Sequence, residues 1–407
     1  MRILLLNQAF YPDVVSTAQY LTDVALELTA SGHEVTVLAG ATAYDDPSVR
    51  FRRRETWKGI EILRIGGIRL GKQSRWRRAI DFGSFMAACM LRLATLRRFD
   101  VVVALTSPPL IATIGRWFVR LKGGRLVFWV MDLNPDEAIA AGWLQARSIP
   151  ARLLEHALRQ SLHGADRIVV LDRYMKDRVV AKGAASEAVA IIPPWSHDDD
   201  VRFDAEAGRR FRRLSRLGDA FVVMYAGNHS PCNPLDTLVS AAVALRDRED
   251  IRFCFVGGGS HFERVRRELH DAGAANAVFV SYRPRHELAG VLSAADLHAV
   301  SMGDPFVGIL HPCKVYNALR VGAPILYLGP DVSHIGDLAR AKPDRIVRVA
   351  HGDADGAVAA IVDAAAAGRR AGEDDVASMT RDALVAEFLR VVTGRAAPQP
   401  KLDPAHI

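Results

Sequence analysis

Cysteine is scarce in this chain. Its 407 residues include four cysteines that lie far apart and form no C-x-x-C pair: Cys89, Cys232, Cys254 and Cys313. Disulfide frameworks and structural zinc sites both need closely spaced cysteines. The sequence therefore argues against both and favours reduced thiols in a reducing compartment.

Long apolar runs are missing as well. Met1 to Leu6 is apolar, but Asn7 and Gln8 end this run well short of a signal peptide. No stretch reaches membrane-spanning length without interruption. We therefore expect the chain to stay where it is made, in the cytoplasm.

The fingerprints of several enzyme classes are absent. The turn Val256-Gly257-Gly258-Gly259-Ser260 does not match G-x-G-x-x-G, and no acidic residue of the dinucleotide type follows it, which disfavours a dehydrogenase. No catalytic triad order and no His/Cys/Asp metal spacing stands out. The run Asp198-Asp199-Asp200 cannot turn three consecutive carboxylates toward one ion, so no metal site is expected.

Positive charge is present in excess and is concentrated. The formal net charge is +7, and two tryptophans, Trp57 and Trp76, lie among the clustered basic residues Arg50, Arg52, Arg53, Arg54, Lys58, Arg69, Lys72, Arg75, Arg77 and Arg78. Such a cluster can meet nucleic acid, an anionic membrane or an acidic substrate, or it can be a plain solvated surface. No nucleic-acid module accompanies it, so we expect no nucleic-acid partner and favour membrane proximity as the functional interpretation.

The length and the pattern of apolar runs predict two α/β domains. A chain of this length exceeds what one core supports. Strands are expected at 2–6, 35–39, 60–65, 101–105, 126–130, 168–171 and 190–192, and again at 221–225, 253–256, 278–280, 297–300 and 325–328. Helical spacing between them indicates two doubly wound domains with a cleft between their sheets. The apolar face of 80–96 is expected to pack on the first sheet rather than face a membrane.

These patterns divide the chain into five parts. Residues 1–192 are expected to form one Rossmann-like domain, and 219–375 a second one. Between them, 193–218 is charged and irregular and is interpreted as an interdomain linker. A C-terminal helix at 376–395 is expected to pack back on the first domain, and 396–407 is expected to be a disordered tail.

The segment 308–330 carries the strongest functional signal. It reads G-I-L-H-P-C-K-V-Y-N-A-L-R-V-G-A-P-I-L-Y-L-G-P and follows a buried strand. A helix is expected to begin at Pro312 or Cys313 and to end at Gly322. Backbone N–H groups, the helix dipole and the ammonium of Lys314 would then point at one anion. This pattern predicts a phosphate site in a nucleotide-dependent enzyme.

Three further loops follow buried strands and would lie in the same cleft. Gly227, in Y-A-G-N-H, lets the backbone approach a phosphate, and His229 could neutralise charge there. Asp132, in M-D-L-N-P-D-E, either holds or activates an acceptor hydroxyl or only caps a turn. Ser16 and Thr17 either present N–H groups to a substrate or form an ordinary helix cap.

Eight short stretches, in this order and spacing, resemble family 4 of the retaining glycosyltransferases over almost the full length. They are F-Y-P-D near the start, G-H-E-V-T-V, D-L-N-P-D-E, I-I-P-P-W, Y-A-G-N, F-V-G-G-G, S-A-A-D and P-C-K-V-Y-N. The chain looks most similar to the branch that assembles bacterial surface polysaccharides. This resemblance implies the GT-B architecture of two Rossmann-like domains facing across a cleft, with 1–192 as the acceptor domain and 219–375 as the nucleotide-sugar donor domain.

The resemblance also implies roles in donor binding. Lys314 and the backbone around Gly308 and Ile309 would lie at the diphosphate, and the loop 281–285 would lie near the base. The donor-binding residues implied in this way are Gly227, Asn228, His229, Gly257, Arg283, Gly308, Ile309, Tyr316 and Asn317.

Three positions depart from the family pattern. Asn317 stands where a glutamate commonly binds ribose hydroxyls, and it keeps hydrogen-bonding capacity but loses the charge. Ile309 stands at the first of two usual glutamates, and Asn228 at a usual arginine. We therefore hypothesise that Lys314 together with His311 and His229 neutralises the diphosphate.

The activity implied by the resemblance is sugar transfer with retained anomeric configuration and without a metal. The nucleotide-diphosphate sugar would be a co-substrate, with no further cofactor. Asp132, Lys314 and His311 would be the catalytic residues. The acceptor, a glycan or a lipid-linked sugar near the anionic inner membrane, would dock at Tyr11, Ser16, Thr17, Asp132 and Asn134.

Two alternatives share the architecture. A non-hydrolysing nucleotide-sugar epimerase would convert the donor without any acceptor. A catalytically silent GT-B protein would act as a scaffold or partner, which the missing glutamate and arginine make credible. Donor turnover and nucleotide binding separate the three possibilities.

Overall fold

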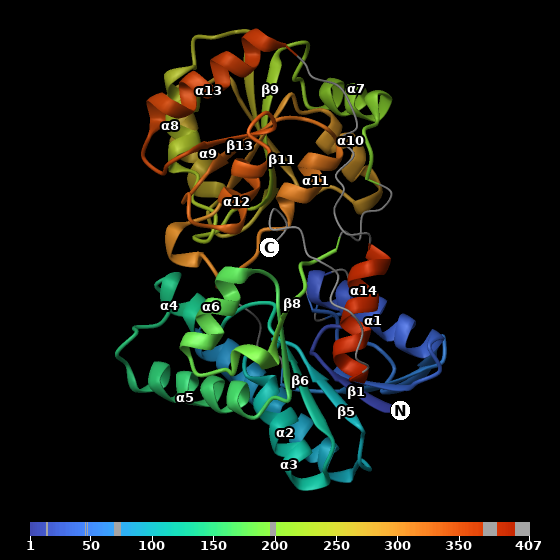
Figure 1. Cartoon of the computed structure of the whole chain (residues 1–407). Coiled ribbons are helices and arrows are strands. Elements are labelled where there is room, and N and C mark those ends of the chain that lie inside the picture. Colours follow the sequence, from blue (N-terminus) through green and yellow to red (C-terminus); the bar gives the residue numbers. More distant parts are fainter. Residues whose placement is uncertain are drawn as a thin grey trace.

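Two α/β domains are stacked one above the other in the computed structural model (Figure 1). The structure describes residues 1–13, 15–44, 46, 48–68, 75–195, 201–368 and 381–394, with the backbone alone at 75, 76, 78 and 79. Each domain has one central sheet with helices packed against it. The expectation of two doubly wound domains is confirmed.

The sheet of the first domain has eight strands in the order β3-β4-β2-β1-β5-β6-β7-β8. All neighbours are parallel except β3 and β4, which pair antiparallel. The strands are β1 (Arg2–Leu6), β2 (Glu34–Gly40), β3 (Arg54–Trp57), β4 (Ile60–Ile65), β5 (Val101–Ala104), β6 (Arg125–Trp129), β7 (Arg167–Val170) and β8 (Val189–Ile191).

The sheet of the second domain has six parallel strands in the order β11-β10-β9-β12-β13-β14. They are β9 (Phe221–Asn228), β10 (Ile251–Gly258), β11 (Ala277–Ser281), β12 (Leu297–Ser301), β13 (Ile325–Leu328) and β14 (Ile346–Val349). The strand order reverses between β9 and β12. In open α/β sheets, ligands bind beyond the carboxyl ends of the strands at such a reversal.

Helices connect the parallel strands. The first domain contains α1 (Ser16–Ala30), α2 (Arg75–Thr95), α3 (Ile111–Lys122), α4 (Asp136–Ala140), α5 (Ile149–His163), α6 (Arg173–Ala181) and the 3-10 turn η1 (Ser186–Ala188). The second half contains α7 (Ala205–Leu214), α8 (Asp236–Ala244), α9 (Phe262–Asp271), η2 (Arg285–Glu287), α10 (Leu288–Ser293), η3 (Asp304–Phe306), α11 (Lys314–Arg320), α12 (His334–Ala341), α13 (Ala354–Ala367) and α14 (Arg381–Thr393).

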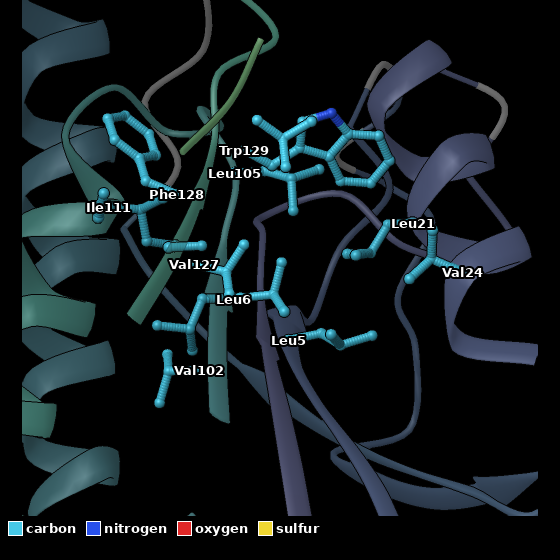
Figure 2. Close-up of a cluster of buried hydrophobic side chains, with 14 of the residues drawn as sticks. Leu5, Leu6, Leu21, Val24, Val102, Leu105, Ile111, Val127, Phe128 and Trp129 are labelled. Atoms are coloured by element: carbon cyan, nitrogen blue, oxygen red, sulfur yellow. The ribbon is translucent and has the colours of Figure 1, made fainter. Parts of the chain in front are cut away.

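The core of the first domain is built from continuous apolar strands. Side chains of β1, β5 and β6 fill the space between the sheet and helices α1 and α3 (Figure 2). Strands covered by helices on both faces need such continuous apolar runs, which explains why the sequence shows them so clearly. The face of α2 that carries Phe85, Cys89 and Leu93 is buried in this core, so the expected packing of this helix is confirmed.

One expectation about the interdomain segment is wrong. Residues 201–218 were expected to be irregular, yet 205–214 form α7, with Asp204 as its N-cap. A Cβ at Gly208 would lie 3.0 Å from the carbonyl oxygen of Ser293, so α7 packs closely on α10. The buried guanidinium of Arg212 holds the carboxylate of Asp296 at 2.6 Å. The many charged residues of α7 masked its helical pattern in the sequence. Its few apolar positions are nevertheless enough to attach it to the second domain.

Two edge strands, β3 and β14, were not expected either. The run Arg54–Trp57 alternates between exposed and half-buried positions at the rim of the first sheet. Ile346–Val349 buries its two end residues and exposes the middle two. Edge strands need little apolar sequence, because one side faces solvent, and a search for apolar runs passes over them.

The C-terminal helix α14 returns to the first domain and lies beside α1 (Figure 1). Phe388 packs on Trp129 with ring centroids 4.1 Å apart. Asp23 of α1 accepts a hydrogen bond from the indole of Trp195 and is paired with Arg381 at 3.3 Å. Both crossings between the domains, near 195 and near 381, are therefore attached to α1. The predicted tail at 396–407 lies outside the described residues.

Among the described residues, no helix combines the length and the apolar character needed to cross a membrane.

Candidate active site

Glycines line the carboxyl ends of β9 and β10. Gly227 has a φ of 144° and Gly257 a φ of 131°, a region that favours glycine. A Cβ at Gly257 would lie 2.1 Å from the carbonyl oxygen of Gly227, so the two strand ends approach closely. A Cβ at Gly227 would lie 2.3 Å from Cε of Lys314. The missing side chain at 227 therefore makes room for this lysine.

Lys314 is the first residue of α11 and crosses to the end of β9. Its ammonium donates to the hydroxyl of Tyr225 over 2.7 Å and lies 4.5 Å from the centre of that ring. The Tyr225 hydroxyl in turn donates to the carbonyl oxygen of Asn228 over 2.7 Å. Burial lowers the pKa of Lys314 to about 7. No carboxylate is paired with this ammonium among the described residues, so it is ready to receive an anion.

A pocket lies beside this lysine. Its empty volume is about 720 Å³, part of it open to solvent. The residues that line it come from the ends of β9 and β10, from the loop after β11, from β12, and from α10 and α11: Ala226, Gly227, Val256, Gly257, Tyr282, Arg283, Leu288, Val291, Leu292, His298, Ala299, Val300, Lys314, Asn317 and Ala318. Five expected donor-site residues thus meet here, at the strand-order reversal: Gly227, Gly257, Arg283, Lys314 and Asn317.

His229 and Asn228 are turned away from that role. The ring of His229 is fully buried, and its Nδ1 donates to the carbonyl oxygen of Gly227 over 3.1 Å. Burial lowers the pKa of His229 to about 4, so the ring is neutral at neutral pH. The hypothesis that it neutralises diphosphate charge therefore loses its physical basis. The side chain of Asn228 lies against Gly259.

Gly308, Ile309 and His311 lie at the domain interface and not along the pocket. A Cβ at Gly308 would lie 2.5 Å from the carbonyl oxygen of Tyr174 in the first domain. The side chain of Ile309 belongs to the core of the first domain, and its N–H donates to the carbonyl oxygen of Phe306. The N–H and the side chain of Ile309 are already engaged, which argues against the expected place of this residue at a diphosphate.

His311 has two buried partners. Its Nδ1 lies 2.8 Å from Oδ2 of Asp172, and its Nε2 lies 2.9 Å from the hydroxyl of Tyr316. His334 stacks on the His311 ring at 3.9 Å with an interplanar angle of 21°. The donor atoms of Asp172, His311 and His334 lie within 4.8 Å of one another. Imidazole lone pairs lie in the ring planes, and two nearly parallel stacked rings cannot direct them at one ion, so this group does not fit a metal.

Asp132 and Asn134 lie in the loop after β6, facing the second domain. The N–H of Leu133 donates to the carbonyl oxygen of Ile309 over 3.0 Å, which joins the two loops across the interface. Burial, with a contribution from the neighbouring Glu137, raises the pKa of Asp132 to about 7. Asn134 donates to the Glu137 carboxylate over 3.0 Å. Asp132 is thus close to half ionised at neutral pH, as a proton acceptor should be.

The carboxylates of the first domain and the lysine of the second are electrostatically coupled to the same thiol. Burial, with contributions from the charges of Glu137 and Asp132, raises the pKa of Cys232 to about 11. Cys232 in turn acts electrostatically on Lys314. Cys232 is therefore within electrostatic range of the carboxylates of the first domain and of the lysine of the second.

The remaining expected acceptor residues are spread along the first loop. Tyr11 is 40% exposed and stacks on Trp57 at 4.0 Å. Ser16 and Thr17 begin α1, whose N-cap is Val15 without a side-chain hydrogen bond, so neither residue is the ordinary cap. The start of α1 reaches the second domain through Gln19, whose side-chain oxygen accepts from Arg285 over 3.0 Å.

Three important residues escaped the sequence reasoning: Tyr225, Glu137 and Asp172. Asp172 directly follows the buried run 168–171, which is the same signal that singled out Asp132. Tyr225 ends an apolar strand run two residues before Gly227 and was counted as core. Glu137 belongs to the motif D-L-N-P-D-E, in which a role was predicted only for the first carboxylate, Asp132.

Comparisons with known proteins show the family of this chain. Residues 17–195 match the model of a glycosyl transferase 4-like domain, and residues 220–366 match that of the glycosyl transferases group 1. A relative in Escherichia coli, named for colanic acid biosynthesis as the glycosyl transferase WcaI, is 25% identical over 84% of this chain and 87% of its own length.

Solved structures share the fold. Sucrose-phosphate synthase of Thermosynechococcus elongatus superposes with a TM-score of 0.74 at 16% identity, covering 97% of this chain and 98% of that one. HepE of Anabaena, in complex with UDP-glucose, superposes with a TM-score of 0.63 at 12% identity, covering 97% and 95%. At these identities the likeness concerns the fold alone.

Proposed function

The chain belongs to family 4 of the glycosyltransferases, and on that premise we propose that it transfers a sugar from a nucleotide-diphosphate donor, with retained anomeric configuration and without a metal. The acceptor is a glycan or a lipid-linked sugar in surface polysaccharide synthesis. The relative named for colanic acid biosynthesis supports this pathway class.

The observation that carries the proposal is the buried Lys314 beside the glycine-lined strand ends. Negative charge grows on the diphosphate as the sugar leaves, so a desolvated ammonium at that place stabilises the transition state more than the ground state. The rest of the pocket, between Arg283 and the apolar residues of α10, receives the nucleoside. UDP-glucose in a protein of the same fold supports this donor class.

On the acceptor side, we assign proton acceptance to Asp132. Its pKa of about 7 suits a group that takes a proton from an attacking hydroxyl. Glu137 assists by keeping negative charge nearby, which holds that pKa up. Tyr11, Ser16, Thr17 and Asn134 remain candidates for contacts to the acceptor.

The first test is Lys314→Ala. Loss of a charge-assisted contact to the diphosphate should weaken nucleoside diphosphate binding by about tenfold to a hundredfold. Isothermal calorimetry with UDP, GDP and ADP measures it, and a screen of the wild type identifies the base. Lys342→Ala is the matched control, because it removes the same group in the same domain outside the pocket. Unchanged affinity in Lys314→Ala would contradict the assignment.

The second test is Asp132→Asn. The variant should bind the nucleoside diphosphate as the wild type does, while turnover falls by about a hundredfold or more, since Asn accepts no proton. The exposed Asp177→Asn serves as the control. The wild type separates the two alternatives. If it converts the nucleotide sugar without any acceptor, it is an epimerase. If it binds the nucleotide sugar but shows no turnover with any acceptor, it is a silent scaffold.

A further inference from the structure

A network of hydrogen bonds connects the first domain to α11, the helix that begins with Lys314. The N–H of Met175, at the start of α6, donates to Oδ1 of Asp172 over 2.8 Å. Oδ2 of the same carboxylate meets Nδ1 of His311 at 2.8 Å, and Nε2 of His311 meets the Tyr316 hydroxyl at 2.9 Å. Tyr316 lies on α11, two residues after Lys314.

Each hydrogen-bond donor in this network has an acceptor. A carboxylate only accepts, so Nδ1 of His311 carries the proton. Nε2 then accepts from the hydroxyl of Tyr316. Asp172 is almost fully buried, at 3% side-chain exposure, and the His311 side chain at 2%. Burial opposes ionisation of Asp172, but the hydrogen bonds that this carboxylate accepts from His311 and from the N–H of Met175 outweigh it and keep the pKa of that carboxyl low. A buried network of this kind, with all partners matched, fixes one arrangement of its elements.

The segment just before α11 is held by the first domain at further points. Arg178 of α6 donates to the carbonyl oxygen of Val307 over 2.5 Å. Gly308 lies against Tyr174, and Ile309 is packed in the first core. Arg173, at the start of α6, also pairs with Asp337 of α12 in the second domain at 2.7 Å. The first domain therefore determines where α11 begins.

We propose that Asp172 is a positioning residue of the donor site: through His311 and Tyr316 it holds α11, and thus Lys314, in place for the diphosphate. This inference rests on the proposed function, since it concerns the same site. It couples the two domains, because a carboxylate of the acceptor domain then contributes to donor affinity without touching the donor.

The test compares two substitutions at position 172. Asp172→Ser keeps a good N-cap for α6 but is too short to reach His311. Asp172→Asn keeps both the cap and the reach, since its amide can donate to His311 in the other tautomer. Asp353→Ser, at the N-cap of α13, is the matched control for loss of a capping carboxylate.

Asp172→Ser is expected to change both the hydrogen exchange of α11 and the affinity for the nucleoside diphosphate. In the ligand-free protein, hydrogen exchange of the α11 amides should accelerate, while that of α13 stays as in the wild type. Affinity for the nucleoside diphosphate that the wild type binds should fall by about tenfold, which is the scale of one hydrogen bond to a charged group. Asp172→Asn should recover most of both effects, and Asp353→Ser should show neither.

Tyr316→Phe removes the other end of the network and tests its continuity. If the network acts as a unit, the double variant Asp172→Ser/Tyr316→Phe should lose little more affinity than the worse single variant. Additive losses, or α11 exchange and affinity that stay unchanged in Asp172→Ser, would overturn the inference. If the wild type binds no nucleoside diphosphate, the proposed function fails, and the exchange measurement alone still decides whether Asp172 positions α11.

Discussion

At the scale of single residues, Lys314 combines features that the sequence shows only in part. It starts a helix, lies across a glycine, and donates to a tyrosine hydroxyl in a buried setting. Burial disfavours its charged form, and the pKa falls to about 7. A bound diphosphate would favour the charged form again. Donor binding and protonation are therefore linked at this residue.

This linkage predicts proton uptake on binding. The pKa of Lys314 is about 7 in the free protein and higher beside an anion, so affinity should fall as pH rises through about 7, with roughly half a proton taken up at neutral pH. Calorimetry in PIPES and in Tris, whose ionisation enthalpies differ, measures the uptake. Lys314→Arg is the control, because arginine stays charged throughout and should bind without this uptake. Equal uptake in both proteins would assign the proton to another group.

At the scale of elements, α7 shows how a charged segment becomes part of a domain. It packs on α10 at Gly208, where no side chain separates the two backbones. Arg212 donates to the carbonyl oxygens of Ala294 and Ala220 as well as to Asp296, so the helix is tied to the start of β9. The peptide between the domains therefore becomes short, ending at Asp204.

The buried ion pair makes α7 a testable part of the second domain. Arg212→Met leaves the Asp296 carboxylate buried without its cation and should destabilise that domain by about 3–5 kcal/mol. Urea unfolding measures the loss. The control Arg54→Met breaks an exposed pair with Glu61 and should cost less than about 1 kcal/mol. A small loss in both variants would mean that α7 is a dispensable linker.

At the scale of the whole molecule, the first domain presents an exposed basic surface on and around β3. Arg50, Arg52, Arg53 and Lys58 are exposed there, and Lys58 lies over the ring of Trp57, which stacks on Tyr11. Arg69 and Lys72 lie outside the described residues. We retain the proposal that this surface brings the enzyme to an anionic membrane that carries a lipid-linked acceptor.

Charge reversal tests that proposal. Arg50, Arg52 and Arg53 changed together to Glu should abolish co-sedimentation with phosphatidylcholine vesicles that contain phosphatidylglycerol, because each basic residue contributes on the order of 1 kcal/mol near such a surface. Arg209, Arg210 and Arg213 on the exposed side of α7 receive the same change as a control and should leave binding intact. A wild type that never binds these vesicles would indicate a soluble acceptor.

The sequence by itself determined most of the buried strands and the place of the pocket beside Lys314. Apolar runs marked the buried strands, and the glycines at 227 and 257 together with Lys314 marked their carboxyl ends at the reversal of strand order. These signals are local, since a parallel strand buried on both faces must be apolar and a phosphate needs open backbone and a cation.

Only the tertiary structure decided which groups the predicted site residues contact. His311 was expected at the diphosphate, yet it meets Asp172, 139 residues earlier in the chain. Ile309 fills the core of the other domain, and His229 is buried and neutral. No local pattern reports such choices, because they depend on how two separately patterned domains pack together and on which polar groups that packing removes from water.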